Sequence, residues 1–250
     1  TAIYPCGGRV GSQLTECLAG ERVPTRTVPI AAETRQSFTV TEMSSGDQYR
    51  FVFPGPELSK EERAACLAAI GERETPPAFI IASGSLPPNT PDRFYRDLAD
   101  LGHRLGARLV VDTSGAALAE ALDEGAFMIK PNLEELRQLD GRPLREEADW
   151  KQAASELVAS GRVEIVALTL GADGALLVTQ GGIYRAPGLP VEVASAVGAG
   201  DSFVAAMVWS LSVGRPVEEA FCWGMAGGTA ALLTPGTELA LPQDVKRLVG

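Results

Sequence analysis

Residues 195–203 read SAVGAGDSF, and this stretch decides how the rest of the chain is interpreted. The loop Gly198-Ala199-Gly200 stands directly before Asp201, which opens an apolar run with helical spacing. Glycine lets backbone N–H groups approach an anion closely, and the dipole of a helix N-terminus favours negative charge there. An aspartate at this position would repel a bound phosphate, so its presence needs a reason. A role in taking a proton supplies that reason. We therefore interpret the amides of residues 199–201 as an anion hole and Asp201 as a general base.

A simpler interpretation of the same residues stays open. Aspartate is common in the first turn of a helix, and glycine is common in the loop before one. Two other phosphate-binding motifs are excluded. No third glycine and later acidic residue complete a dinucleotide-binding fingerprint, and no Gly-Lys-Ser/Thr completes a Walker A loop.

Composition narrows the class of protein. The 250 residues carry a net charge of −10, so nucleic acid and anionic membrane surfaces are not expected as partners. We expect a cytoplasmic location, because no run approaches the roughly 20 apolar residues of a membrane helix and no signal segment opens the chain. His103 is the only histidine and falls near the end of an expected helix, so Ser-His, Cys-His and multi-histidine metal mechanisms are excluded. The base must then be a carboxylate or a lysine.

From residue 78 onward, apolar β-branched segments alternate with segments of helical spacing. The expected strands are Ala78–Ala82, Arg108–Val111, Phe127–Ile129, Glu164–Thr169, Ala175–Val178 and Gly182–Ala186, with the last two joined as a hairpin. The expected helices are Asp92–Leu105, Ala116–Asp123, Leu133–Leu139, Glu146–Ser160, Asp201–Val213, Val217–Leu233 and Gln243–Val249. This alternation predicts an α/β fold, a doubly wound and mostly parallel sheet with helices on both faces. We expect one domain over residues 1–250.

Residues 34–54 differ from this pattern and predict a small antiparallel β flap. Ser37–Met43 and Gln48–Phe53 alternate polar and apolar residues on either side of the turn sequence Ser44-Ser45-Gly46-Asp47. The apolar side chains share one face of each strand: Phe38 and Val40 on the first, and Tyr49, Phe51 and Phe53 on the second. Such a face packs either on the main domain over a ligand or on a second subunit. We expect the flap to act as a lid and as a contact in a homodimer.

A second polar motif, Lys130-Pro131-Asn132-Leu133-Glu134-Glu135, follows the expected strand Phe127–Ile129. Asn132 can cap the next helix, with Glu135 three positions later as in a capping box. Alternatively, Asn132 and Glu135 organise a hydrated Mg²⁺ near a nucleoside triphosphate, since Mg²⁺ keeps several waters and needs few protein ligands. Both interpretations stay open on these residues alone.

Four more segments carry candidate site residues, each with a simpler alternative. Thr169–Ala175 and Ser83–Pro87 follow strands and also fit ordinary turns, and Arg35 is either a solvated charge or a fork for a sugar phosphate. Residues 224–231 indicate close helix packing or room for a flat ring. Ligands of open α/β sheets bind beyond the carboxyl ends of the strands. Residues 83–88, 130–135, 169–175 and the loop before Asp201 all fall at that edge. Their coincidence predicts a ligand site more strongly than any one of them.

The segment Ala196–Phe203 resembles the C-terminal signature of the PfkB (ribokinase-like) carbohydrate kinases. Asn132-Leu133-Glu134-Glu135 resembles the Asn-x-x-Glu motif of that family, and the similarity extends over essentially the whole chain. Residues 34–36 and 48–55 are more selective, because they resemble the PfkB-type 6-phosphofructokinases, 1-phosphofructokinases and tagatose-6-phosphate kinases. The resemblance implies ATP-dependent phosphoryl transfer to the primary hydroxyl of a sugar phosphate.

The resemblance favours fructose 6-phosphate as the acceptor and fructose 1,6-bisphosphate as the product. The alternatives are 1-phosphofructokinase, tagatose-6-phosphate kinase, and a nucleotide-binding fragment that is impaired in catalysis. By resemblance, Asp201 is the catalytic base, and Gly198, Ala199 and Gly200 supply the amides that neutralise the developing charge.

The resemblance also implies roles for residues elsewhere in the chain. The ATP-binding residues are Lys130, Asn132, Thr169, Gly171, Gly174 and Gly227, and the sugar-phosphate residues are Arg35 and Ser85. The metal-binding residues are Asn132 and Glu135 for Mg²⁺, through water, and Ser195, Val197, Ala231 and Gly236 for a monovalent cation such as K⁺.

The beginning of the chain departs from the family pattern. Thr1-Ala2-Ile3-Tyr4 is expected as a strand that runs into a loop, Cys6-Gly7-Gly8. The N-terminal Gly-Gly-rich segment of the family, with an asparagine that grips the sugar, is not found. We therefore expect the sequence to begin inside the kinase domain, without at least one βαβ-sized piece of about 30 residues. Such a fragment is expected to bind sugar poorly.

Overall fold

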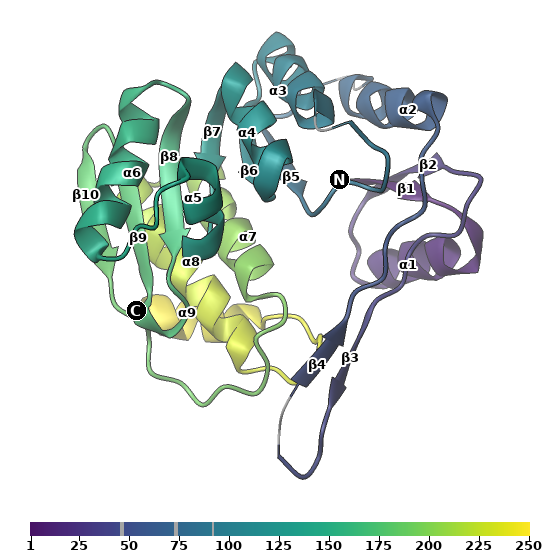
Figure 1. The fold of residues 1–250 in the computed structure, drawn as a ribbon. Coiled ribbons are helices and arrows are strands. Elements are labelled where there is room, and N and C mark those ends of the chain that lie inside the picture. The colour runs from purple at the N-terminus through teal and green to yellow at the C-terminus, as the bar shows by residue number, and fades with distance from the viewer. Residues whose placement is uncertain (46–47, 73–74, 92) are drawn as a thin grey trace.

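A six-stranded sheet forms the centre of the molecule in the computed structural model, which describes residues 1–45, 48–72, 75–91 and 93–250. The strand order is β10-β9-β8-β7-β6-β5 (Figure 1). The strands are β5 (Phe79–Ser83), β6 (Arg108–Asp112), β7 (Ala126–Ile129), β8 (Val163–Thr169), β9 (Ala175–Thr179) and β10 (Gly182–Ala186). β5 to β8 run parallel to one another. β9 runs antiparallel to β8, and β10 runs antiparallel to β9. The predicted mostly parallel sheet with a terminal hairpin is confirmed.

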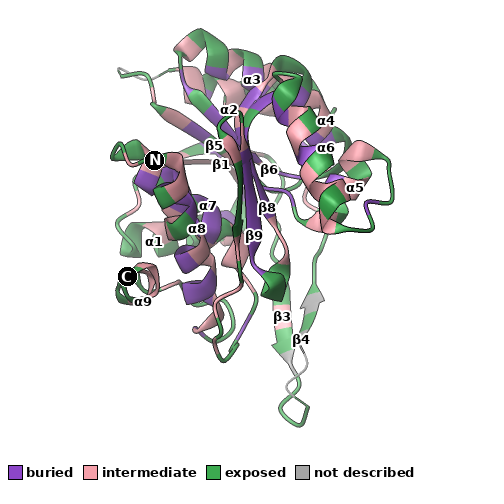
Figure 2. Cartoon of the chain, turned by 90° about the vertical axis from the view of Figure 1, so that its left-hand side faces the viewer, coloured by how far each residue is buried: buried purple, intermediate pink, exposed green. Residues whose placement is uncertain are grey.

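Helices cover both faces of this sheet. One face packs against α3 (Arg93–Leu105), α4 (Gly115–Glu124), α5 (Leu133–Asp140) and α6 (Glu147–Ala159). The other face packs against α7 (Ala199–Ser212) and α8 (Val217–Leu232), and α9 (Pro242–Val249) contacts α8. Figure 2 shows the strands as the buried centre between these two layers. The start expected for α3, Asp92, lies outside the described residues. No helix in the described part of the chain is long and apolar enough to cross a membrane.

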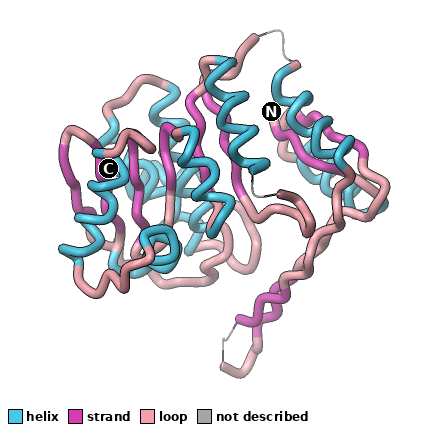
Figure 3. Tube along the Cα trace, turned by 45° about the horizontal axis from the view of Figure 1, so that its top comes forward, coloured by secondary structure: helices cyan, strands magenta, loops and turns pink. Residues whose placement is uncertain are grey.

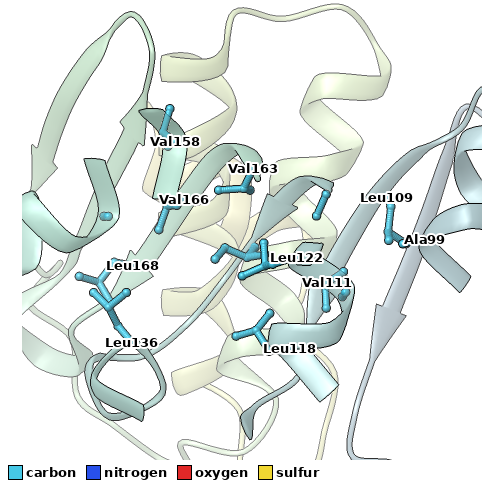
Figure 4. Packing of buried hydrophobic residues seen from close by; sticks show 14 of the residues in the cluster. Ala99, Leu109, Val111, Leu118, Leu122, Leu136, Val158, Val163, Val166 and Leu168 are labelled. Atoms are coloured by element: carbon cyan, nitrogen blue, oxygen red, sulfur yellow. The ribbon is translucent and has the colours of Figure 1, made fainter. Parts of the chain in front are cut away.

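Strand β6 shows why the central strands read as continuous apolar runs. Leu109 and Val111 belong to the core on the α3–α6 side, whereas Val110 belongs to the core on the α7–α8 side. Leu118 and Leu122 lie four residues apart on α4, so they share one helix face and enter the same core as Val111 (Figure 4). A strand buried on both faces has no polar side. This packing holds the carboxyl ends of β5 to β8 in place.

The N-terminal third contains elements that the sequence pattern did not predict. β1 (Ala2–Cys6) pairs in parallel with β2 (Thr25–Pro29), and α1 (Gly8–Gly20) connects them. The strand expected at residues 1–4 is confirmed, but the expected loop is wrong at Gly8, where α1 begins. The Oε1 atom of Glu33 accepts a hydrogen bond of 2.8 Å from the backbone N–H of Val10, which satisfies a free donor at the start of this helix.

Helix α2 (Lys60–Gly71) was also missed, although it carries a readable start signal. The Ser59 hydroxyl accepts from the N–H of Glu62 at 3.1 Å, and the Glu62 carboxylate accepts from the N–H of Ser59 at 2.7 Å. This is a capping box, and the spacing of Ser59 and Glu62 is its sequence signature. The signal was available in the sequence, in contrast to β2.

The predicted β flap is present as a hairpin that projects away from the main body (Figure 3). β3 (Phe38–Thr41) and β4 (Gln48–Phe51) are shorter than expected, and Gly46 and Asp47 of the predicted turn lie outside the described residues. Phe38 pairs with Phe51, and their ring centroids are 5.0 Å apart. The two rings remain 50% and 47% exposed, respectively. The predicted apolar face is confirmed, and within this chain it stays largely uncovered.

Candidate functional site

The N-terminus of α7 is built as the motif at residues 195–203 predicts, with a small shift. The helix begins at Ala199, two residues before the expected start, and Gly198 is its N-cap with φ of 79°. No side chain in the described part of the chain caps this end, so the N–H groups of the first turn stay free. A Cβ at Gly198 would meet nothing within 4 Å, so the loop is open on that side. Asp201 lies exposed in the same turn.

Lys130 lies against this helix end. Its side chain is buried, and its Nζ lies 3.2 Å from the Oδ1 of Asp112, the last residue of β6. A Cβ at Gly200 would lie 3.2 Å from the same Nζ, so only glycine fits there without displacing the ammonium. The structure therefore brings a positive charge to the open amides of α7. Such an end is suited to an anion.

Asp112 is a site residue that sequence reasoning missed. Burial raises the pKa of its carboxyl group, the Lys130 ammonium opposes that rise, and the negative charges of Asp201 and Glu135 add to it. Its only sequence signal is an acidic residue directly after the apolar run Arg108–Val111. Its partner Lys130 comes from the next strand, so the pairing itself depends on the sheet register.

Asn132 and Glu135 form the capping box of α5. The Oδ1 of Asn132 accepts from the N–H of Glu135 at 2.9 Å, and the Oε2 of Glu135 accepts from the N–H of Asn132 at 2.8 Å. The simpler interpretation of this motif is therefore confirmed. No three His, Cys, Asp or Glu side chains converge on a metal position within the described ranges. Any Mg²⁺ near Glu135 would then be held largely by water and by the phosphates of the nucleotide, and this role stays a prediction.

The loops after β7 and β8 lie side by side. Thr169 donates from its N–H to the carbonyl of Pro131 at 2.9 Å and from its hydroxyl to the same oxygen at 3.3 Å. Thr169 also forms an isolated bridge with Asn132. Two of the predicted ATP-binding residues thus meet at the carboxyl edge of the sheet, in agreement with the expected ligand position.

Three predicted nucleotide-binding glycines have structural reasons to be glycine. Gly171 and Gly174 have φ of 59° and 96° in the turn between β8 and β9. A Cβ at Gly174 would lie 2.2 Å from the carbonyl of Ala186. On α8, a Cβ at Gly227 would lie 2.6 Å from the Cβ of Ala206 on α7. The tight turn and the close helix packing are therefore confirmed, and contacts with a nucleotide stay predictions.

The residues predicted to bind a monovalent cation lie near one loop crossing. The Ser195 hydroxyl donates to the carbonyl of Gly236 at 2.7 Å and accepts from the N–H of Val197 at 3.3 Å. The carbonyl of Ala231, in the last turn of α8, accepts from the hydroxyl of Thr234 at 3.0 Å. Carbonyl and hydroxyl oxygens suit a hard cation. A K⁺ site at these residues stays a prediction.

The predicted sugar-phosphate residues meet in space although they are 50 positions apart. The Nη1 of Arg35 donates to the Oγ of Ser85 at 3.5 Å. Both residues line a cavity of about 550 Å³, which continues along β5 toward β1. Ser83 lines it too, and its hydroxyl donates to the Oδ1 of Asp201 at 3.3 Å. The loop after β5 therefore connects the predicted base with the predicted phosphate-binding arginine.

Known proteins of similar sequence and structure indicate the family to which this site geometry corresponds. The sequence matches the pfkB family of carbohydrate kinases over residues 1–244. The ATP-dependent 6-phosphofructokinase isozyme 2 of Mycobacterium tuberculosis (strain ATCC 25618 / H37Rv) is 42% identical over 247 residues, which are 99% of this chain and 73% of that protein. The isozyme 2 of Escherichia coli (strain K12) is 39% identical over 249 residues, 99% of this chain and 80% of that protein. The crystal structure of Escherichia coli phosphofructokinase-2 in complex with potassium has a TM-score of 0.95 at 39% identity, over 99% of this chain and 80% of that chain.

Proposed function

The chain belongs to the pfkB family of carbohydrate kinases, and we propose that it transfers a phosphoryl group from ATP to fructose 6-phosphate, giving fructose 1,6-bisphosphate. The observation that carries this proposal is the meeting of three features at the end of β5. They are the carboxylate of Asp201, the open amides of α7 and the Arg35–Ser85 pair. The similarity to two ATP-dependent 6-phosphofructokinases supports this acceptor.

In this proposal, the α7 end performs the phosphoryl transfer. Asp201 takes the proton from the primary hydroxyl of the sugar as that oxygen attacks the γ-phosphate. The backbone N–H groups around Gly198, Ala199 and Gly200 and the ammonium of Lys130 face the negative charge of the transferred group. Phosphoryl transfer needs little covalent help from a protein, so positioning and charge stabilisation supply most of the catalysis.

The nucleotide lies, in this proposal, along the loops after β7 and β8. Thr169, Gly171 and Gly174 line it, and Gly227 faces the adenine. Mg²⁺, when bound, neutralises charge on the phosphates, and Asn132 and Glu135 hold its water shell. The capping box uses the Oε2 of Glu135, so its other carboxylate oxygen can face that shell.

The sugar phosphate lies at the polar end of the cavity, where the Arg35 guanidinium forms a fork for it and Ser85 adds a hydroxyl. We assign residues 1–250 to one kinase domain, with 34–54 as lid and homodimer contact. The exposed apolar face of the hairpin supports the dimer. A K⁺ held at Ser195, Val197, Ala231 and Gly236 and a cytoplasmic location complete the proposal. The relative crystallised with potassium supports the cation.

A coupled assay of ADP release with three acceptors tests this function. We expect turnover with fructose 6-phosphate at a kcat/KM well above the values for fructose 1-phosphate and tagatose 6-phosphate. A preference for either of the other two sugars would change the substrate and leave the kinase class intact. Binding of ATP in calorimetry without ADP release from any acceptor would contradict the kinase and indicate a nucleotide-binding protein.

A further inference from the structure

We propose that Ser83 is a positioning residue for Asp201, and that the loop Ser83-Gly84-Ser85 sets the distance between the base and the phosphate-binding end of the site. The proposal rests on the function assigned above to Asp201. Ser83 has no role in that function so far, because only Ser85 of this loop was assigned to the substrate.

The carboxylate of Asp201 has one hydrogen-bonding side chain in the described part of the chain. The Ser83 hydroxyl donates to its Oδ1 at 3.3 Å, across a separation of 118 residues. Asp201 is exposed in the first turn of α7, where an aspartate side chain can otherwise rotate freely. A hydrogen bond to Oδ1 removes much of that freedom. The other oxygen, Oδ2, stays available to accept a proton from the substrate.

The backbone that carries Ser83 is held firmly. Ser83 is the last residue of β5, where it pairs with Asp112 of β6. The following residue, Gly84, has φ of 101°, which side-chain-bearing residues rarely adopt. Its N–H donates to the carbonyl of Asp112 at 3.0 Å. Its carbonyl accepts from the hydroxyls of Tyr95 at 2.7 Å and Thr113 at 3.0 Å.

Tyr95 and Thr113 are both buried, so these two donors belong to the rigid core rather than to the surface. Ser83 therefore presents its hydroxyl from a fixed point, while the side chain itself is exposed to the site. A fixed donor is what the orientation of a flexible acceptor requires.

The other serine of the loop faces the opposite end of the site. Ser85 accepts from Arg35 at 3.5 Å, two residues along the chain from the hydroxyl that holds Asp201. One short and rigid tripeptide thus touches both the base and the predicted phosphate anchor. A sugar phosphate gripped by Arg35 would then present its far hydroxyl at a set distance from Oδ2. Such alignment contributes to rate because misplacement of reacting atoms is costly.

The kinetic test compares Ser83→Ala with Ser83→Thr, which keeps the hydroxyl. We expect Ser83→Ala to lower kcat about tenfold to a hundredfold, the loss typical of a hydrogen bond to a charged group. The KM for fructose 6-phosphate should stay within about twofold, because the substrate contact of Ser85 remains. Ser83→Thr should recover most of the rate. Ser212→Ala, an exposed serine far along α7, is the matched control and should behave as wild type.

Rescue by the conservative variant separates orientation from a merely structural role. A loss of kcat in Ser83→Ala that Ser83→Thr restores, at a nearly constant KM, follows from the hydroxyl that holds Oδ1 rather than from the fold of the loop. The charged groups that face Asp201, the Asp112 carboxylate and the Lys130 ammonium, are the same in every variant. Thermal unfolding of Ser83→Ala should match wild type, because this side chain is exposed.

A second readout works without turnover. In protein with ¹³C-labelled aspartate carboxyls, the signal absent from Asp201→Asn identifies Asp201. At a fixed pH, its chemical shift should change in Ser83→Ala and return toward the wild-type value in Ser83→Thr, because the hydrogen bond to Oδ1 is lost in one variant and kept in the other. If wild type shows this behaviour but no kinase activity, the proposed function fails and the positioning contact stands. An unchanged chemical shift, an unchanged kcat, or a rise in KM alone would overturn the role of Ser83.

Discussion

The central strands of the six-stranded sheet bury their apolar side chains, whereas the β3–β4 hairpin leaves them exposed to solvent. Leu122 and Met128 are fully buried in the two layers around the large sheet, whereas Phe38 and Val40 of the hairpin are 50% and 45% exposed. On the edge strand β5 of the large sheet, Ile81 is also 47% exposed. The central strands of the large sheet therefore cover their apolar surface within the chain, and the hairpin does not. This difference indicates that the first region supplies a rigid platform and that the second is shaped for contact with a ligand or a second copy.

The largest expected effect falls on the platform, at Asp201. Asp201→Asn keeps the size of the side chain and removes its ability to take a proton. We expect kcat for ADP release to fall roughly 10²–10⁴-fold, as is typical when a general base is lost. The affinity for ATP in calorimetry should change little. A rate near that of wild type would show that Asp201 is not the base.

Truncation of one apolar side chain in each region tests the comparison by stability. Leu122→Ala should lower the free energy of unfolding by about 2–5 kcal/mol, because it leaves a cavity in a closed core. Val40→Ala removes a half-exposed side chain and should cost well under 1 kcal/mol by the same reasoning. Urea titrations of the two variants measure the difference. Similar losses would mean that the hairpin is part of the same closed core.

Two capping boxes allow the metal role of Glu135 to be separated from its helix cap. Glu135→Gln keeps the capping geometry, because glutamine serves at this position as well. It should nevertheless raise the Mg²⁺ concentration needed for half-maximal activity about tenfold to a hundredfold. Glu62→Gln makes the same change in the capping box of α2 and should leave the Mg²⁺ requirement unchanged. If both variants need the same Mg²⁺ concentration for half-maximal activity, Glu135 serves only as a helix cap.

The hairpin is tested by its effect on assembly. Phe38→Ser removes one of the two stacked rings and places a hydroxyl on the apolar face. In sedimentation velocity, the dimer of the variant should dissociate at protein concentrations about tenfold higher, or more, than the dimer of the wild type. An unchanged dimer, or a wild type that is monomeric, would leave the hairpin as a lid only.

The smallest expected effect concerns the pH dependence of stability at Asp112. Its pKa lies above the usual 3.8 in the folded protein, chiefly because of burial, so the folded state binds this proton more tightly than the unfolded chain. The group then stabilises the fold below pH 3.8, and that contribution is lost as the pH rises through the folded pKa. The unfolding free energy of wild type minus that of Asp112→Asn should therefore decrease between acid and neutral pH. A difference that increases with pH would contradict the direction of the shift.

The same contrast explains which elements the sequence pattern predicts. The strands β5 to β9 and the helices around them are readable because their apolar residues are numerous and buried. α1 and α2 bury only Gly11 and Ala69, respectively, so neither contributes much to the buried core. α2 has little apolar periodicity, whereas Val10, Leu14 and Leu18 of α1 do lie at helical spacing and form a readable signal that was missed.

The residues of the site also fall into a group that the sequence pattern predicts and a group that it does not. The loop and base at Gly198–Asp201 are local in sequence, and their geometry follows from residues that are neighbours. The partners Asp112 and Ser83 are not local, because β5, β6 and β7 bring them to α7 only when the sheet has formed. Pairwise contacts between strands depend on register, and a single sequence does not fix register for strands buried on both faces.

In the proposed reaction, Asp201 directs the phosphoryl group of ATP to the primary hydroxyl of fructose 6-phosphate rather than to water. A ³¹P NMR time course with ATP, Mg²⁺, fructose 6-phosphate and the protein measures this directly. We expect a second sugar-phosphate signal, from the newly esterified C1, that grows in equal amount with ADP and is lost in Asp201→Asn. Growth of inorganic phosphate in place of that signal, or the same signal from Asp201→Asn at an unchanged rate, would contradict it.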